Sequence, residues 1–288
     1  MNRRARLALG LLGLFGRLPL GLLRALGSLL GEVALLLGIR EARVARRNLE
    51  AAFPEWSPAR RAALLRENLC QTGAALFELA WLWTRPPAEV LSKVREVRGL
   101  ADFDVPRASG RPLMVLTPHI GAFELLSLWL GERTDIRVLY RPPKQRWLED
   151  LLVTVRSRTG SVLLPAEPAT VRTLLKHLRG GGTVGILPDQ QPKAGEGGFA
   201  PFFGIPAFTM TLAPKLIASG GATAVLAWVE RVRGGFVVHL QCLDPPPMDA
   251  AALNAAVESI ARQAPAQYQW GYKRWSMRPP EESARFYD

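Results

Sequence analysis

The sequence predicts an α/β protein whose central, largely parallel or mixed sheet is flanked by helices, with a membrane-associated helical segment at its N-terminus. Three observations support this class. The 288 residues are 48% hydrophobic and 22% charged, enough for a sizeable core and too apolar for a disordered chain. Short apolar runs alternate with helical segments after residue 113. Residues 1–47 carry nine arginines against two glutamates, which is +7 of the net charge of +12.

The first predicted domain is a membrane-anchoring helical segment over residues 1–39. Its longest uncharged stretch, Leu7 to Gly16, is shorter than the ~18 residues of a simple membrane span. On a helix over residues 17–39, one narrow stripe holds all the polar side chains, namely Arg17, Arg24, Ser28 and Glu32. The rest is apolar, which is typical of a helix in or on a bilayer, its polar seam facing headgroups or its own domain.

Two other interpretations of this segment stay open. It could be a buried core helix, or a signal peptide opening with Met-Asn-Arg-Arg-Ala-Arg. Arg17 and Arg24 interrupt the apolar stretch, so a retained anchor is favoured. We then expect that removing residues 1–39 leaves a folded domain with poor access to lipid.

The second predicted domain, residues 40–288, contains the sheet. A helix is predicted from the Ser57-Pro58 cap to about Trp83. Strands are predicted at 113–117, 136–140, 161–165 and 183–189, with helices at 121–131, 145–158, 168–179, 209–219 and 249–264. A hairpin is predicted over 222–243. Continuous apolar strands between helices predict a parallel sheet covered on both faces.

Polar side chains follow three of these strands. His119 comes after the first strand, Arg141 after the second, and Asp189 ends the strand at 183–189. The carboxyl ends of parallel strands share one edge of a sheet, so this edge is the predicted site. Glu124 lies five residues beyond His119, and a turn at Gly121 would let its carboxylate approach the imidazole and make that ring a better base.

A phenylalanine-rich loop follows Asp189. Phe199, Phe202 and Phe203 lie within GGFAPFFGIPA, and we interpret them as an apolar wall for an acyl chain beside the polar cluster.

Several classes of site are excluded by composition. Two distant cysteines and three scattered histidines offer neither a disulfide framework nor metal-ligand spacing. Phosphate-loop and dinucleotide fingerprints are missing, so neither cofactor nor metal is predicted. The strongly basic chain calls for an anionic partner, and because its arginines are embedded among leucines, an anionic membrane surface is favoured over nucleic acid.

The motifs together resemble a known family. TPHIGAFELL, YRPP, GILPDQQ and GGFAPFFGIPAFTMT are similar, in order and spacing, to the late lauroyl and myristoyl transferases of lipid A biosynthesis, within the His-x4-Asp/Glu glycerolipid acyltransferases. VARRNLEAAFPEWSPARRAALLRENL and YQWGYKRW also resemble family segments. The usual His-Phe-Gly-Asn-Trp-Glu stands here as His-Ile-Gly-Ala-Phe-Glu, so the Asn-Trp pair is replaced by Ala122-Phe123.

The resemblance implies an acyl-carrier-protein-dependent O-acyltransferase of lipopolysaccharide biosynthesis, acting at the cytoplasmic face of the cell inner membrane. His119 would be the general base, with Glu124 orienting and stabilising its imidazolium. Arg141 would bind the acceptor phosphate or polarise the reacting carbonyl. Asp189 would orient Arg141 or another basic group.

Three further functions remain open. The same fold could acylate another lipid, such as a phosphatidylinositol mannoside or a lysophospholipid. His119 could instead activate water in a thioesterase. The chain could also be a non-catalytic membrane-surface binding protein, in which His119 and Glu124 are incidental turn residues.

Overall fold

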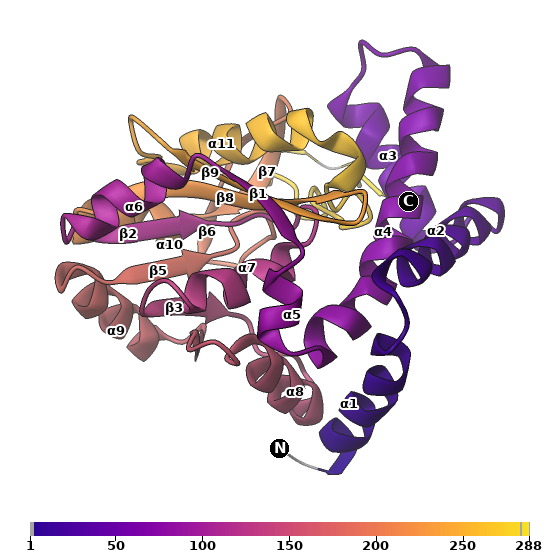
Figure 1. Cartoon of the computed structure of the whole chain (residues 1–288). Coiled ribbons are helices and arrows are strands. Elements are labelled where there is room, and N and C mark those ends of the chain that lie inside the picture. Colours follow the sequence, from indigo (N-terminus) through magenta and orange to yellow (C-terminus); the bar gives the residue numbers. More distant parts are fainter. Residues whose placement is uncertain (1–2, 283, 288) are drawn as a thin grey trace.

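A seven-stranded sheet forms the centre of the computed structural model, which describes residues 3–282 and 284–287 (Figure 1). Its strand order is β1-β9-β8-β2-β5-β3-β4, and every neighbouring pair is parallel except β8 and β9. The strands are β1 (Val94–Arg98), β2 (Leu113–Leu116), β3 (Ile136–Tyr140), β4 (Val162–Pro165), β5 (Thr183–Ile186), β8 (Thr223–Val232) and β9 (Gly235–Cys242). A separate antiparallel hairpin consists of β6 (Gly197–Phe202) and β7 (Ile205–Met210).

Helices cover both faces of this sheet (Figure 1). All the helices of the described chain are α1 (Arg3–Gly16), α2 (Leu20–Leu36), α3 (Arg40–Ala52), α4 (Pro58–Thr84), α5 (Pro87–Leu91), α6 (Leu100–Ala108), α7 (Phe123–Gly131), α8 (Arg146–Arg156), α9 (Pro168–Arg179), α10 (Leu212–Gly220) and α11 (Ala250–Gln263), followed by the 3-10 turn η1 (Pro265–Gln267).

Successive side chains of β2 point to opposite faces of the sheet, so this strand contributes to two separate hydrophobic cores. Met114 and Leu116 belong to one buried cluster, with residues of α9, α10 and α11. Leu113 and Val115 point the other way, into a second cluster with residues of α4, α6 and α7. All four are at most 1% exposed, so β2 is covered on both sides, as its continuous apolar sequence predicts.

The second N-terminal helix packs tightly on α4. A Cβ atom added to Gly27 or Gly31 of α2 would lie 2.2 Å from the carbonyl oxygen of Gly73 or of Leu69, respectively. The polar seam faces the protein: Arg24 donates to Glu78, Ser28 to the Cys70 carbonyl, and Glu32 accepts from Arg66. This packing argues against the expectation that removing residues 1–39 would leave the remainder undisturbed.

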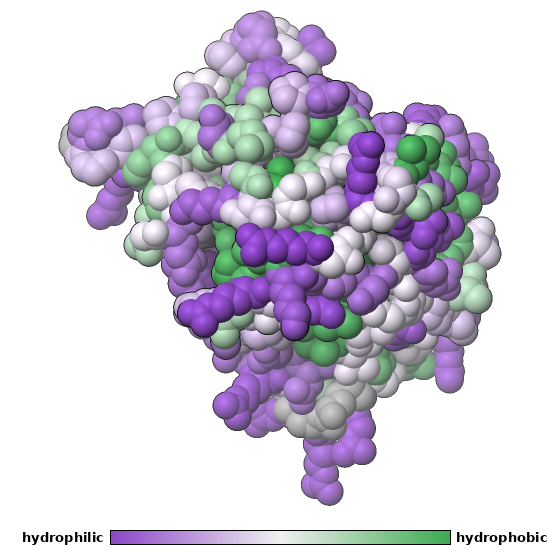
Figure 2. Space-filling view, turned by 90° about the vertical axis from the view of Figure 1, so that its left-hand side faces the viewer, coloured by the Kyte–Doolittle hydropathy of each residue, from purple (hydrophilic) through white to green (hydrophobic). Residues whose placement is uncertain are grey.

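The outer sides of α1 and α2 are apolar and uncovered. Within the described part of the chain, twelve of the eighteen exposed large hydrophobic residues lie between Leu7 and Ile39. The face turned to the viewer in Figure 2, the left-hand side of Figure 1, is dominated instead by hydrophilic side chains, with hydrophobic residues visible in the gaps between them. Exposed apolar surface is therefore concentrated on the two N-terminal helices.

No helix in the described ranges is by itself long and apolar enough to cross a bilayer. Taken together, α1 and α2 meet that length and composition test, but they are bent by 104° at the break between them. The predicted boundary after residue 39 coincides with the start of α3 at Arg40.

The predicted α/β class, with a largely parallel sheet flanked by helices and a helical N-terminal segment, is confirmed, and so are the elements from α4 onward that carry apolar periodicity. β3 and α9 have the predicted bounds, and α4 begins as predicted, with the Ser57 side chain accepting a hydrogen bond from the Arg60 amide. Prediction from the sequence missed α3, β1, α5, α6 and the β6–β7 hairpin.

Candidate active site

The predicted site residues His119 and Asp189 meet at the carboxyl edge of the sheet. His119 follows β2 and Asp189 follows β5, and these two strands are parallel neighbours. Asp189 accepts two hydrogen bonds from the same residue: the His119 amide donates to Oδ2 at 2.9 Å, and Nδ1 lies 2.8 Å from Oδ1. One carboxylate therefore fixes both the backbone and the ring of the histidine.

This contact determines which ring nitrogen is free. An ionised carboxylate can only accept, so Nδ1 carries the proton and Nε2 presents its lone pair. Nε2 lies 3.3 Å from the amide nitrogen of Gln190, which also donates to Gln269 at 3.1 Å. The His119 side chain retains 16% exposure, so the imidazole is partly accessible from outside the protein.

The charge on Asp189 is favoured in spite of its burial. Burial by itself raises the pKa of this carboxyl, but the imidazole and amide of His119 outweigh that effect and hold the pKa below its usual value. Asp189 is therefore an ionised carboxylate that orients His119 and stabilises its protonated form.

Glu124 lies elsewhere than predicted. Its carboxylate forms a two-point ion pair with Arg156 at the end of α8: the guanidinium Nε donates to Oε2 at 2.8 Å and an Nη donates to Oε1. The predicted approach of Glu124 to the imidazole is not among the contacts of either residue. The carboxylate partner of His119 is therefore Asp189, in the place predicted for Glu124, and the basic group next to Asp189 is His119.

The Glu124–Arg156 pair organises the start of α7. Burial disfavours the Arg156 cation, but the Glu124 carboxylate more than compensates, so the pKa of Arg156 is raised. Phe123, adjacent to Glu124, contacts the His119 ring edge-on with centroids 4.8 Å apart. Two consecutive residues at the start of α7 thus contact Arg156 and the imidazole, respectively.

Gly121 is required by the turn between His119 and α7. Its φ is +58°, and a Cβ atom there would lie 1.8 Å from the carbonyl oxygen of Val229. The Ala122 amide donates to that same carbonyl. No other residue type fits this close approach of the loop to β8.

Two buried asparagines hold the C-terminal wall of the site. Asn68 of α4 donates to the carbonyls of Ala266 and Tyr268, and Asn48 of α3 donates to those of Trp270 and Tyr272. Between them, the Gln269 amide donates to the His119 carbonyl. The segments RRNL, RENL and YQWGYKRW, which resemble the family, are therefore parts of one clamp on the histidine loop.

Arg141 is exposed at the end of β3, beside the strand that leads to Asp189. It lies close enough to lower the pKa of Tyr272, although burial of that phenol dominates and raises its pKa overall. The Tyr272 hydroxyl accepts from the Gln191 amide, two residues beyond Asp189. Arg141 thus stands at the rim of the site with its guanidinium available to a ligand.

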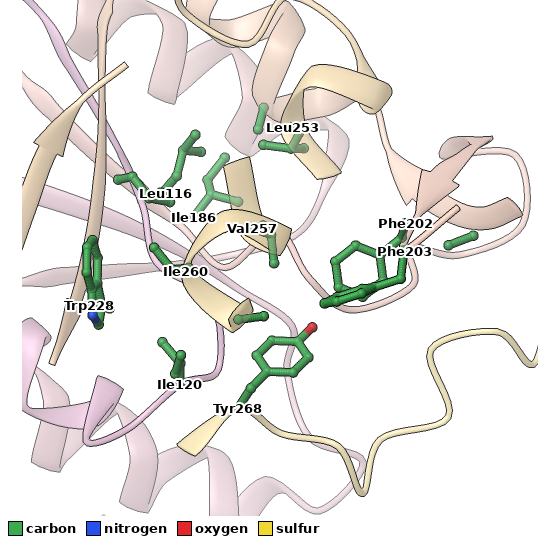
Figure 3. Close-up of a cluster of buried hydrophobic side chains, with 14 of the residues drawn as sticks. Leu116, Ile120, Ile186, Phe202, Phe203, Trp228, Leu253, Val257, Ile260 and Tyr268 are labelled. Carbon is green, nitrogen blue, oxygen red and sulfur yellow. The ribbon is translucent and has the colours of Figure 1, made fainter. Parts of the chain in front are cut away.

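The phenylalanines do not form the predicted wall together. Phe202 and Phe203 are 1% and 7% exposed and pack edge to face beside Tyr268 in the core (Figure 3). Phe199 is 38% exposed and contacts Phe208. Of the three, Phe199 alone is on the surface and free to contact an acyl chain.

Arg274 and the two cysteines have structural rather than reactive environments. Arg274 is buried and donates to the Phe208 carbonyl, Thr209 and Asn254, so it braces the β6–β7 hairpin. Burial raises the pKa of both cysteines, that of Cys70 to about 11 with help from Glu32, so neither is an activated thiol. The described residues contain no cluster of three or more histidine, cysteine or acidic side chains that could hold a metal.

Arg156, Gln190, Gln269 and the two asparagines were not singled out from the sequence. Gln190 was visible as the neighbour of Asp189 in GILPDQQ, and Gln269 lies in YQWGYKRW. Arg156 had no local signal, because its partner is 32 positions away in the chain.

Comparison with known proteins gives one consistent result. The family model for the bacterial lipid A biosynthesis acyltransferases matches residues 3–277. The lipid A biosynthesis palmitoleoyltransferase and lauroyltransferase of Escherichia coli K12 are each 28% identical, covering 96% and 97% of this chain and 92% and 94% of those proteins. The myristoyltransferase of the same organism is 26% identical over 88% of this chain and 80% of its own length.

These similarities extend over the histidine loop, the Asp189 strand and the C-terminal clamp described above. The chain is an acyltransferase and belongs to the bacterial lipid A biosynthesis acyltransferase family.

Proposed function

We propose that this protein is a membrane-associated O-acyltransferase that moves a fatty acyl chain from an acyl-carrier-protein thioester to a hydroxyl of a lipid A precursor. The single observation that carries the proposal is the His119–Asp189 pair at the carboxyl edge of the sheet, with the His119 side chain 16% exposed and Nδ1 held at 2.8 Å by a buried carboxylate. Such a pair is suited to accept a proton from an alcohol.

The reaction follows from this geometry. Nε2 of His119 accepts the proton of the acceptor hydroxyl while the oxygen of that hydroxyl attacks the thioester carbonyl. The C–O bond forms, the C–S bond breaks, and the imidazolium returns the proton to the departing thiolate. Asp189 stabilises the imidazolium between these two transfers. In this scheme Glu124 acts through Arg156 and Phe123, as a positioning residue, and no covalent acyl-enzyme is needed.

Arg141 is proposed to bind an anionic group of the acceptor. A guanidinium offers a fork of donors that matches phosphate oxygens, and that of Arg141 is exposed at the same edge of the sheet. Phe199, which is exposed and packs against Phe208, is proposed to contact an acyl chain. Arg141→Ala should therefore raise the KM for acceptor more than it lowers kcat.

Membrane association at the cytoplasmic face of the inner membrane is proposed from the exposed leucines of α1 and α2. Leu7, Leu29 and Leu36 are 66%, 62% and 83% exposed. Nearby arginines of this basic segment would favour anionic headgroups by roughly 1 kcal/mol each. The positive charges of these arginines would also attract an acidic carrier protein.

The experiment is incubation of the membrane-reconstituted protein with acyl-carrier-protein donors of several chain lengths and a lipid A precursor, read by mass spectrometry. Transfer of the acyl chain to the precursor is the expected result. Release of free acid alone would indicate a thioesterase. Acylation of added lysophospholipid or phosphatidylinositol mannoside in place of the precursor would show that the acceptor is another lipid.

His119→Ala should lower turnover by at least ~100-fold, the usual contribution of a general base. The matched control is His177→Gln on α9, whose ring bonds the Asp135 carbonyl away from the site. Equal activity of the His119→Ala protein and the control would contradict the proposal and favour a non-catalytic surface protein.

A further inference from the structure

Helix α1 has two apolar faces in different surroundings. On the inner face, Ala5 is completely buried in a small cluster with Leu151 and Val155 of α8, and Leu9 and Leu12 are packed against this cluster. On the outer face, every large apolar side chain is more than half exposed, namely Leu7, Leu11, Leu14 and Phe15. The inner face therefore packs on α8 and on the end of α4, and the outer face is free for a bilayer.

The helix that α1 contacts also carries Arg156. Val155, which is 2% exposed and contacts α1, is adjacent in sequence to the arginine that holds Glu124. The Glu124 side chain is 6% exposed and that of Arg156 21%, so the ion pair is enclosed and sensitive to small displacements of α8. A shift of α8 would thus be transmitted to the first turn of α7.

A second set of contacts fixes the other end of α1. Arg85, directly after α4, donates to the carbonyls of Gly16 and Arg17, each at 2.8 Å. The Arg85 carbonyl in turn accepts from Arg158, two residues beyond Arg156. The C-terminus of α1, the end of α4 and the segment after α8 are therefore linked by hydrogen bonds.

We infer that α1 is a positioning element of the active site: its inner face holds α8 so that Arg156 keeps Glu124 in place at the start of α7, and bilayer contact through its outer face holds α1 against α8. A 14-residue helix is only marginally stable by itself, so α1 depends on both faces being covered. Leu9 and Leu12 are positioning residues in this scheme. The inference rests on the proposed acyl transfer and membrane contact, and it makes turnover dependent on the membrane.

Two pairs of leucines on the same helix give a matched test. Leu9→Ala with Leu12→Ala removes inner-face contacts, whereas Leu7→Ala with Leu11→Ala removes the same number of carbon atoms from the outer face. In anionic vesicles of phosphatidylglycerol and phosphatidylcholine, the inner pair should lower kcat roughly 10- to 100-fold with little change in KM, as expected when a reacting group is displaced. The outer pair should weaken vesicle binding and raise the apparent KM for lipid, and at saturating lipid its kcat should stay closer to that of the wild type than the kcat of the inner pair.

Two further measurements separate positioning from general destabilisation. The inner pair should accelerate amide hydrogen exchange in α8 but leave α9, which does not contact α1, unchanged. In a Glu124→Gln background the inner pair should cause little additional loss of kcat, because both changes act through the same ion pair. Leu9→Met with Leu12→Met should restore kcat, since methionine fills a similar volume.

Additive losses in the Glu124→Gln background, or equal kcat for the inner and outer pairs, would overturn the inference. A wild-type protein without acyl transfer would contradict the proposed function instead. In that case the hydrogen-exchange comparison of α8 and α9 still decides whether α1 holds α8.

Discussion

At the scale of single residues, the site depends on which carboxylate meets which cation. Two acidic side chains lie within reach of the histidine loop, and the fold gives Asp189 to His119 and Glu124 to Arg156. Their spacing along the chain suggested the opposite, because Glu124 is five residues from His119 and Asp189 is seventy. Parallel pairing of β2 with β5 makes the distant residue the closer partner.

The first prediction concerns the tautomer of His119. Asp189→Asn keeps the shape of the side chain but removes the charge that holds the proton on Nδ1. We expect kcat to fall at least ~100-fold with a nearly unchanged KM, because the base and its stabilised imidazolium are both lost. Steady-state kinetics would check this, with Asp135→Asn on the surface as control. A loss confined to KM would mean that Asp189 binds substrate instead.

The second prediction is a dependence of stability on pH. The pKa of Asp189 is lower in the folded protein than in the unfolded chain, because His119 stabilises its carboxylate. This contribution is therefore fully present above the ordinary carboxyl value of about 4 and disappears as the pH falls through the lower, folded value. The free energy of unfolding should consequently decline over this acidic range, measured by urea titration. Asp189→Asn should decline less steeply, and an unchanged slope would contradict the assigned charge.

At the scale of elements, prediction from sequence succeeded where local pattern and tertiary environment agree. β3, α9 and the β8–β9 hairpin each have an apolar run or helical period that burial confirms. β1 was missed because Val-Arg-Glu-Val-Arg is a charged edge strand whose partner, β9, lies some 140 positions away. Such pairing leaves no trace in the local sequence.

The β6–β7 hairpin was missed for another reason. Prolines at 201 and 206 are typical of loops, yet they lie opposite each other in this two-stranded ribbon. The turn between the strands places Phe203 at a φ of +51° and Gly204 at +73°, as a tight hairpin turn requires. The side chains then alternate, which buries Phe202 and exposes Phe199. The predicted acyl wall failed at this step, since it assumed one surface for all three phenylalanines.

The third prediction tests the contact between α2 and α4. A Cβ atom on Gly73 would lie 2.0 Å from the Gly27 carbonyl oxygen, so Gly73→Ala must push the two helices apart. We expect a loss of about 1–3 kcal/mol in the free energy of unfolding and faster proteolysis of residues 1–39. Gly21→Ala on α2, whose Cβ would meet open space, should leave both unchanged. Equal behaviour of the two variants would show that α2 is not packed as described.

At the scale of the whole molecule, the N-terminal helices connect the apolar outer surface to the sheet and the site. α1 contacts α8, α2 packs on α4, and α4 supplies Asn68 to the C-terminal wall (Figure 1). The predicted division into residues 1–39 and 40–288 follows composition, whereas the packing crosses it repeatedly. Composition identifies the apolar segment, but not how that segment is attached to the rest of the protein.

The last prediction concerns the charge cluster that makes this attachment. Glu78 of α4 is 1% exposed and accepts hydrogen bonds from Arg24 of α2 and Arg231 of β8. Arg24 also donates to the carbonyls of Val232 and Gly235, so one carboxylate neutralises two arginines that join α2, α4 and the sheet.

Glu78→Gln leaves both cations without a counter-charge in a buried place. We expect the free energy of unfolding to fall by about 3–5 kcal/mol, the cost of breaking a buried pair. Glu89→Gln breaks a partly exposed pair with Arg85 and should cost less than about 1 kcal/mol. Denaturant titration of the two variants would measure the difference. Similar losses would mean that solvent reaches the cluster, and that α2 is held mainly by its other contacts with α4.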